Sequence, residues 1–325
     1  MSEPIISIQN VSKVFQYSKR QGLKGFLHPE IQKVTAVNNV SLQIERGESV
    51  AFIGPNGAGK STTIKMLCGI LQPSKGDISV LGFNPLKQRR QLAYQIGTVF
   101  GQRSQLIFNL PLIDSLKLSA DMYGLERSTI APRIKEVTEQ FNLSEFVNQP
   151  VRKLSLGQRM RAEIANSLLH EPEIIFLDEP TIGLDVVAKR SLREVIRQTN
   201  KEKGTTIFLT SHDVGDIEEV SDRTIIVNHG QIMLDTPTDQ LKQDYLENKT
   251  VRVVLKKPLE EMPTIMGTTA QSEEDGVIVF SVDTSKHKLK NFLPAMLETV
   301  EVADMTIEDT PLEDIIHELY VRQEQ

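Results

Sequence analysis

Short apolar runs alternate with longer amphipathic segments through most of the chain. Three runs are apolar and largely bounded by polar residues, as is typical of strands buried in a parallel sheet: residues 48–54, 173–179 and 205–211. Longer segments space their apolar residues as helices do: residues 60–71, 156–170 and 186–203. Strands that alternate with helices predict an α/β domain with a parallel core.

The beginning of the chain departs from this alternation. Residues 5–15 and 34–44 are strand-like, and no helical pattern separates them. We therefore expect an antiparallel β part before the parallel sheet, interrupted by an insertion at residues 18–33.

The end of the chain follows a third pattern. After a closing helix near residue 240, strands are expected at 251–255, 277–282 and 300–307, and helices at 285–297 and 311–320. These elements predict a first domain over residues 1–245 and a small accessory α+β domain over residues 246–325.

Length and composition fit two globular domains. The 325 residues are 39% hydrophobic and 25% charged, which is the composition of a folded protein. No stretch approaches the roughly 20 apolar residues that cross a bilayer, and the N-terminus lacks the pattern of a signal peptide. We expect a cytosolic protein unless a partner recruits it to a membrane.

Charge and metal-ligating residues narrow the function further. The formal net charge is −6, and residues 246–325 hold 8 Lys and Arg against 16 Asp and Glu. This acidic end argues against nucleic-acid binding there. A single cysteine, Cys68, and six scattered histidines argue against a structural metal site.

A glycine-rich motif of the form G-x-x-x-x-G-K-[ST] lies between an expected strand and an expected helix. In such a loop the backbone N–H groups face phosphate oxygens. A lysine then contacts the β- and γ-phosphates, and a hydroxyl binds Mg²⁺. The motif comprises Gly54, Pro55, Asn56, Gly57, Ala58, Gly59, Lys60 and Ser61, and Thr62 can add a phosphate contact. It predicts binding of MgATP or a related nucleotide.

Two carboxylates end the apolar run that begins at residue 174. Asp178 and Glu179 are expected at the carboxyl edge of a parallel strand, where open α/β sheets bind ligands. Asp178 would approach Mg²⁺ through a water. Glu179 would act as the general base that orients the attacking water.

Further segments resemble the ATP-binding-cassette (ABC) ATPases. Leu154-Ser155-Leu156-Gly157-Gln158 is similar to the family's signature loop, although Leu156 replaces the usual glycine, and it lies 23 positions before Asp178. The resemblance implies that Ser155, Gly157 and Gln158 complete the nucleotide site of an opposite protomer, through contacts of Ser155 and Gly157 with the γ-phosphate. It therefore implies a dimer of two copies with ATP between them.

The same resemblance implies four other nucleotide-site residues. Asp185, in Thr181-Ile182-Gly183-Leu184-Asp185, matches the D-loop that crosses the dimer interface, and His212 matches the switch histidine near the γ-phosphate. Gln102 is the preferred Q-loop glutamine, which would reach Mg²⁺ and the water, and Gln105 is the alternative. Phe15 matches the aromatic residue that stacks on adenine, and Tyr17 is a second candidate.

Within the family, four features resemble the exporter type whose permease is a separate, ABC-2-like chain. They are GQRSQL in the Q-loop, LSLGQRMR, the insertion and the ending Pro311-Leu312-Glu313-Asp314-Ile315. The resemblance implies a location on the cytoplasmic face of the membrane, where the loop beyond the Q-loop contacts that integral-membrane permease.

Two other function classes remain as alternatives. A soluble cassette ATPase acting on DNA would need hundreds of coiled-coil residues between Lys60 and Asp178, which lie only 118 positions apart, and a ribosome-acting one would carry two cassettes. A small-molecule kinase shares the phosphate loop but has no need of the signature loop. We therefore expect no nucleic-acid partner.

Overall fold

The computed structural model describes residues 3–19, 30–101, 104–211, 213–245, 248–257, 259, 261–272, 276–284 and 286–309. The chain divides into two compact units, Met1–Thr238 and Asp239–Gln325. The division falls at the beginning of helix α9 (Thr238–Tyr245), which the sequence pattern assigned to the first domain. Along the described residues, no helix has both the length and the apolar character needed to cross a bilayer.

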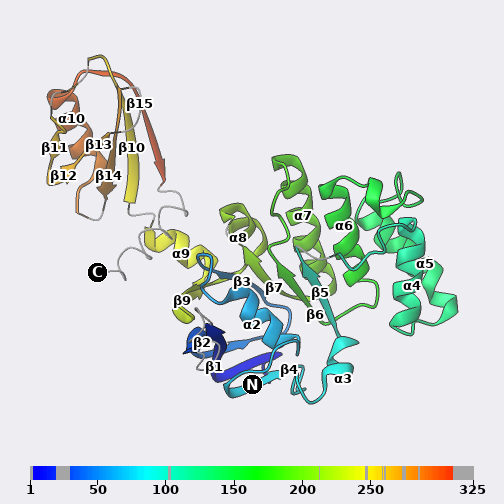
Figure 1. Cartoon of the computed structure of the whole chain (residues 1–325). Coiled ribbons are helices and arrows are strands. Elements are labelled where there is room, and N and C mark those ends of the chain that lie inside the picture. The colour runs from blue at the N-terminus through cyan, green and yellow to red at the C-terminus, as the bar shows by residue number, and fades with distance from the viewer. Residues whose placement is uncertain are drawn as a thin grey trace. The chain divides into compact units, whose positions relative to one another are not determined.

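The centre of the first unit is a six-stranded sheet in the order β5-β6-β7-β3-β8-β9 (Figure 1). All pairs are parallel except β8 with β9, which confirms the α/β class. The strands are β3 (Ser49–Ile53), β5 (Ile96–Phe100), β6 (Ile174–Asp178), β7 (Thr206–Ser211), β8 (Arg223–Asn228) and β9 (Gln231–Pro237). Register aligns Phe100 with Asp178, and Asp178 with Thr210, so the carboxyl ends of these strands meet at one edge.

Alternating side chains of the central strands supply two separate cores. Ile175 and Leu177 of β6 join the core that includes the helices after β5, whereas Ile174 and Phe176 join the core that includes the antiparallel strands. Because successive residues of a strand point to opposite faces, a continuous apolar run is needed to fill both cores. The helices are α2 (Lys60–Leu67), α3 (Arg89–Ala93), α4 (Leu112–Met122), α5 (Arg127–Gln140), α6 (Leu156–Ser167), α7 (Val186–Lys203) and α8 (Val214–Val220), with a 3₁₀ turn at Val151–Lys153.

Helix α2 is shorter than its sequence pattern indicates. It ends at Leu67 because Gly69, two residues on, adopts a left-handed conformation with φ of 67°, and the N–H groups of Gly69 and Ile70 bond back to Met66 and Lys65. A glycine in this conformation is a common helix stop, since it carries no Cβ.

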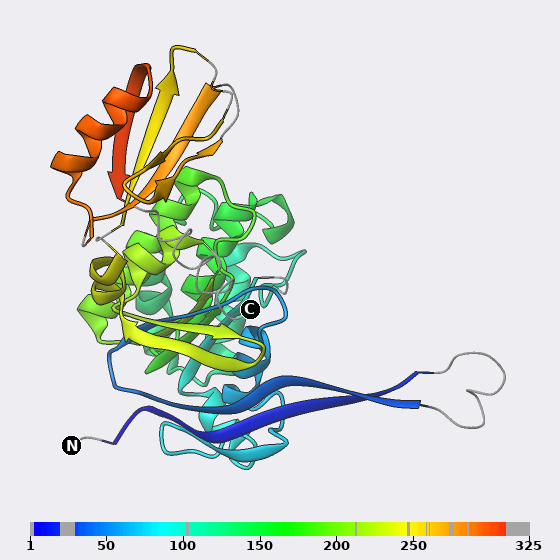
Figure 2. The same ribbon diagram turned by 90° about the vertical axis from the view of Figure 1, so that its left-hand side faces the viewer.

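A three-stranded antiparallel sheet in the order β2-β1-β4 forms the expected β part. Its strands are β1 (Ile6–Lys19), β2 (Glu30–Ile44) and β4 (Lys75–Val80). The expected insertion boundaries at 18 and 33 are wrong, because Ser18 pairs with Ile31 and Lys19 with Glu30. Figure 2 shows the β1–β2 ribbon running out beyond the rest of this unit. Backbone pairing in such an exposed ribbon needs no apolar face. The ends of these two strands are largely polar, so the hydrophobic pattern of the sequence did not indicate that the strands continue.

The second unit is a small α+β fold, as the sequence predicts. Its sheet has the order β13-β14-β10-β15, with a separate β11–β12 hairpin. The strands are β10 (Asn248–Leu255), β11 (Thr264–Ile265), β12 (Thr268–Thr269), β13 (Gln271–Ser272), β14 (Val277–Asp283) and β15 (Val302–Asp309). Helix α10 (Leu289–Thr299) packs Phe292 edge-on against Phe280, with ring centroids 5.3 Å apart.

Helix α10 begins later than residue 285, its predicted start. The N–H groups of Lys286 and His287 bond to the Asp283 carbonyl and form a turn instead. The helix predicted at 311–320, like the ending at 311–315, lies outside the described residues.

His170, just beyond α6, is held in a neutral state. Its ring stacks on Tyr123 with centroids 3.7 Å apart, and its Nε2 donates to the Ile96 carbonyl at 3.1 Å. The other ring nitrogen, Nδ1, is buried and has no hydrogen-bond partner among the described residues. Burial lowers the pKa of His170 to about 4, because a second ring proton would have no acceptor.

We expect the stability of the protein to fall as the pH drops from 6.5 towards 4. In this window the unfolded His170 binds a proton and the folded one does not, so folding loses up to about 1.4 kcal/mol per pH unit. His170→Gln keeps an N–H donor but cannot titrate. Denaturant unfolding of this variant should therefore lose less stability in this pH window than the wild type. Equal losses in the two proteins would contradict this account.

Candidate functional site

The phosphate loop connects β3 to α2, and two of its glycines are required by their surroundings. A Cβ on Gly54 would lie 2.3 Å from the Val227 carbonyl oxygen, and one on Gly59 would lie 2.3 Å from the Ala36 carbonyl oxygen. Gly59 also has φ of 101°, a conformation that side chains disfavour. The residues between them are exposed from Pro55 to Gly57, whereas Ala58 is buried. This exposed part of the loop is therefore accessible to a ligand.

Lys60 begins α2 and lies across the phosphate loop. Its side chain is 7% exposed, and its Nζ donates to the carbonyls of Gly54 at 2.6 Å and Pro55 at 3.3 Å. The same Nζ lies 3.7 Å from Glu179 Oε1. A nearly buried ammonium at a helix N-terminus attracts a phosphate anion through charge and backbone N–H groups together.

Ser61 and Asp178 meet at the carboxyl edge of the sheet. Ser61 Oγ donates to Asp178 Oδ1 at 3.0 Å, and Thr210 Oγ1 donates to the same oxygen at 2.7 Å. A hydroxyl and a carboxylate at hydrogen-bonding distance are the oxygen donors that Mg²⁺ uses beside a phosphate. The residues therefore fit Mg²⁺. Thr62 follows Ser61 in the first turn of α2 and is half-buried.

Glu179 occupies a tight turn directly after β6. It has φ of 55°, which for a residue other than glycine costs about 1 to 3 kcal/mol and persists only where surrounding contacts hold it. Its N–H donates to the Thr210 carbonyl at 3.0 Å. The two acids have different neighbours, because Glu179 Oε1 lies 3.7 Å from Lys60 Nζ and Asp178 Oδ1 accepts from Ser61 and Thr210.

The signature loop forms the N-terminus of α6. Ser155 caps the helix: its Oγ accepts from the Gln158 N–H at 3.2 Å, while Gln158 Oε1 accepts from the Ser155 N–H at 2.9 Å. The Gln158 side chain, expected at the nucleotide, is therefore bonded within its own loop. Leu156 is the first residue of the helix, so this capping geometry does not require the family's glycine there.

Asp185 caps α7, and its side chain accepts from the Ala188 N–H at 2.8 Å. It lines a cavity of about 520 Å³ together with Ser155, Gly157 and Gln158. Among the described residues, the lining of this cavity includes no member of the phosphate loop. The structure thus brings the expected site residues together in two groups, one around Lys60 and one around Ser155.

Gln102 and His212 lie outside the described residues. The alternative glutamine, Gln105, donates its side-chain N–H to the Thr98 carbonyl at 2.7 Å. Phe15 is 38% exposed on β1, where the Lys13 Nζ lies 5.1 Å from its ring centre, and Tyr17 on the same strand is 49% exposed. Both rings remain accessible to a planar base.

Sequence reasoning missed Thr210, which bonds to both acids of the site. A threonine near the end of an otherwise apolar strand was the available signal, because strand ends at this edge face the ligand. It also missed the buried Asp216, which lies four residues after His212.

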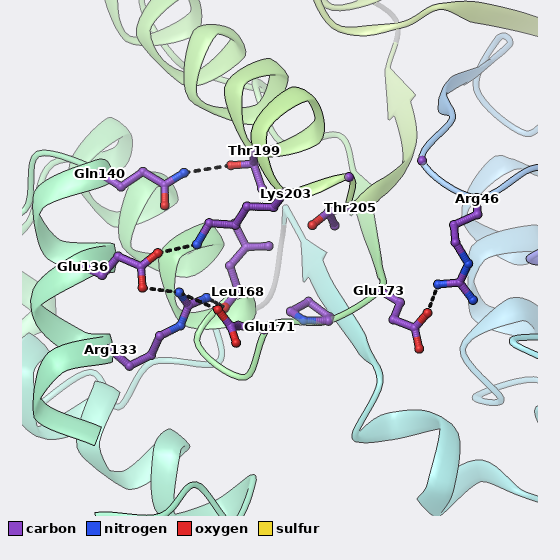
Figure 3. A pocket seen from close by; sticks show the side chains of 13 residues that line it. Arg46, Arg133, Glu136, Gln140, Leu168, Glu171, Glu173, Thr199, Lys203 and Thr205 are labelled. Carbon is purple, nitrogen blue, oxygen red and sulfur yellow. Dashed lines mark hydrogen bonds and ion pairs between the residues drawn. The ribbon is translucent and has the colours of Figure 1, made fainter. Parts of the chain in front are cut away.

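A second cleft, of about 720 Å³, lies at the opposite edge of the sheet (Figure 3). Gly47, Glu173 and Thr205, which precede β3, β6 and β7, contribute to its lining. Its cations are already paired with carboxylates: Arg46 with Glu173, Arg133 with Glu136 and Glu171, and Lys203 with Glu136. The cleft is therefore distinct from the expected nucleotide site.

Known proteins share these features. Residues 37–182 match the family described as ABC transporter. The chain is 37% identical to the ABC transporter ATP-binding protein NatA of Bacillus subtilis over 62% of this chain and 81% of that protein. It is 31% identical to the bacitracin transport ATP-binding protein BcrA of Bacillus licheniformis, over 86% of this chain and 90% of that protein.

A solved structure of the ATP-binding cassette MJ0796, a dimer in a post-hydrolysis state bound to ADP and Pi, superposes with a TM-score of 0.60. The identity is 25% over 72% of this chain and 98% of that one. Identity above 30% along nearly the whole of a relative, together with the phosphate loop, the two acids and this fold, establishes the family. The chain belongs to the ABC family, as an ATP-binding subunit of a transporter that hydrolyses ATP.

Proposed function

We propose that two copies of this chain bind two MgATP molecules at their interface and hydrolyse them to drive export through a separate integral-membrane permease. The observation that carries the proposal is the division of the site into two groups. The Lys60 group offers phosphate and metal ligands, and the Ser155 group lines a different cavity. A head-to-tail pair of chains would join the two groups across each interface.

Each residue has a proposed role. The backbone of Gly54 to Gly59, Lys60 and Thr62 bind phosphate, and Ser61, Asp178 and Gln102 hold Mg²⁺, which neutralises phosphate oxygens. Glu179 orients and deprotonates water, and His212 stabilises the transition state. From the partner come Ser155, Gly157, Gln158 and Asp185, and Phe15 stacks on adenine. We assign residues 1–245 to the ATP-binding domain and 246–325 to an accessory domain.

An apolar loop after β5 supports contact with a permease. Ile107, Phe108 and Leu110 are 38%, 51% and 38% exposed. Exposed apolar side chains gathered on one loop are typical of interaction sites. Glu163 of α6 anchors the beginning of this loop, because it accepts from the Ser104 hydroxyl and the Gln105 N–H. A permease bound here would therefore hold the chain at the cytoplasmic face of the membrane. It would also be connected to the signature helix α6 through the bonds of Glu163.

The export direction rests on the resemblance of GQRSQL and LSLGQRMR to exporter-type cassettes, and a relative named for bacitracin transport supports it.

The docking surface can be tested with Phe108→Asp, which places a charge on the apolar loop. Co-expressed with a polytopic membrane protein chosen as the candidate permease, the wild type should copurify with that protein, and Phe108→Asp should lose most of this association because a charge is desolvated.

Leu297→Asp is the matched control, because Leu297 is equally exposed, at 51%, on α10 of the second unit. It should keep the association. Equal loss in both variants would contradict the docking site, and copurification of the wild type with ribosomes or DNA instead would contradict the transport role.

A further inference from the structure

Asp216, the third residue of α8, has a buried carboxylate that binds side chains from three other elements. Its exposed fraction is 1%. Its Oδ2 accepts from the Thr181 hydroxyl and from the Ser211 hydroxyl, both at 2.6 Å. Its Oδ1 accepts from Arg193 Nε, also at 2.6 Å. One carboxylate therefore joins the loop after β6, the end of β7 and helix α7.

Arg193 binds the carboxylate oxygen of Asp216 that Thr181 and Ser211 do not use. Its side chain is 10% exposed, and it also donates to Asp213 at 2.6 Å and Glu219 at 3.2 Å. Burial lowers the pKa of Arg193, but the hydrogen bond and charge of Asp216 outweigh it, so the net shift is upward. A Cβ on Gly215 would lie 2.3 Å from Arg193 Nη1, so the guanidinium fits closely against α8. Arg193 therefore holds Asp216 in one arrangement through hydrogen bonding and close packing.

The two hydroxyls that Asp216 binds lie on both sides of the Glu179 turn. Thr181 is two residues beyond Glu179 in the chain. Ser211 follows Thr210, whose carbonyl accepts the Glu179 N–H. A left-handed turn such as that of Glu179 persists only where its surroundings fix it. Asp216 is bonded both to the loop that follows the turn and to the strand end that accepts the Glu179 N–H.

We propose that Asp216, held by Arg193, is a positioning residue for ATP hydrolysis. It acts through Thr181 and Ser211, and it sets the direction of the Glu179 carboxylate and the course of the loop that leads to Asp185. The inference rests on the proposed role of Glu179 as the general base. A purely stabilising role fits less well, because buried ion pairs add little net stability over apolar residues, whereas several short bonds select one geometry.

The first test uses Thr181→Val, which removes one hydroxyl with almost no change of shape. We expect kcat to fall about 10-fold or more, since a small misplacement of a catalytic group has effects of this size. The Kd for ATP should stay within about twofold, because the phosphate loop is untouched. Asp216→Ala should lower kcat further. The matched control is Thr199→Val, another buried threonine, whose hydroxyl bonds to Val195 and Gln140. It should keep the wild-type kcat.

The second test adds Thr181→Val to Glu179→Gln and measures single-turnover hydrolysis. If Thr181 acts through Glu179, the double variant should hydrolyse ATP no more slowly than Glu179→Gln alone. Wild-type kcat in Thr181→Val, or a loss that adds fully to that of Glu179→Gln, would overturn the inference and leave the proposed function standing. Wild-type turnover in Glu179→Gln itself would show that Glu179 is not the general base, and this inference would fall with that role.

Discussion

Replacement of Glu179 by glutamine should remove most ATP turnover and leave MgATP binding intact. The amide cannot accept the proton of the attacking water, and the loss of a general base lowers rates about 10²-fold to 10⁴-fold. The bond between Ser61 and Asp178 does not involve Glu179, and removal of the negative charge 3.7 Å from Lys60 Nζ does not weaken the attraction of this ammonium for phosphate. Steady-state phosphate release and titration calorimetry with ATP measure the two quantities separately. With hydrolysis blocked, ATP should hold the variant as a dimer in size-exclusion chromatography.

Lys60→Ala provides the contrasting control. Its ammonium is nearly buried and bonded to the phosphate loop, so its loss should weaken ATP affinity itself. The two variants therefore separate binding from chemistry. Turnover of Glu179→Gln at the wild-type rate would show that another group accepts the proton.

The parts of the fold that follow from local chemistry could be predicted from the sequence. Residues 174–177 form an uninterrupted apolar run because both faces of β6 are covered, and the two acids follow because the strand ends there. Gly54 and Gly59 are glycines because backbone carbonyls approach them closely. In these cases a local structural requirement, such as a strand covered on both faces or a close backbone approach, selects one type of residue. The requirement can therefore be inferred from the sequence alone.

Contacts between distant segments could not be predicted in this way. Thr210 lies 32 positions from Asp178, and Asp216 lies 35 from Thr181, yet each pair is hydrogen-bonded. Periodicity does not indicate which polar side chains will share a partner after folding. The same holds for Gln158, whose pattern matched a nucleotide-contacting loop, although its side chain caps the helix. A motif identifies the residues of a site more readily than the direction of each side chain.

Two inactive variants should partly restore activity when they are combined in one dimer. Lys60→Ala damages the phosphate loop, and Ser155→Arg places a bulky cation in the signature loop, where Ser155 is exposed. If each site joins the phosphate loop of one chain to the signature loop of its partner, a mixed dimer has one site with both lesions and one with neither. Random mixing makes half of the dimers mixed, so about a quarter of wild-type turnover should return.

The control is Ser155→Thr, which keeps a capping hydroxyl and should retain most of the activity, whereas loss of the cap alone costs about 1 kcal/mol of helix stability. Mixed dimers can be isolated with two different affinity tags, so that their formation is measured independently of turnover. If the isolated mixed dimer is no more active than its inactive parents, each site must be built within one chain. Recovered activity instead requires that the Lys60 group and the Ser155 group act across the interface, because no single chain in the mixture carries both groups intact.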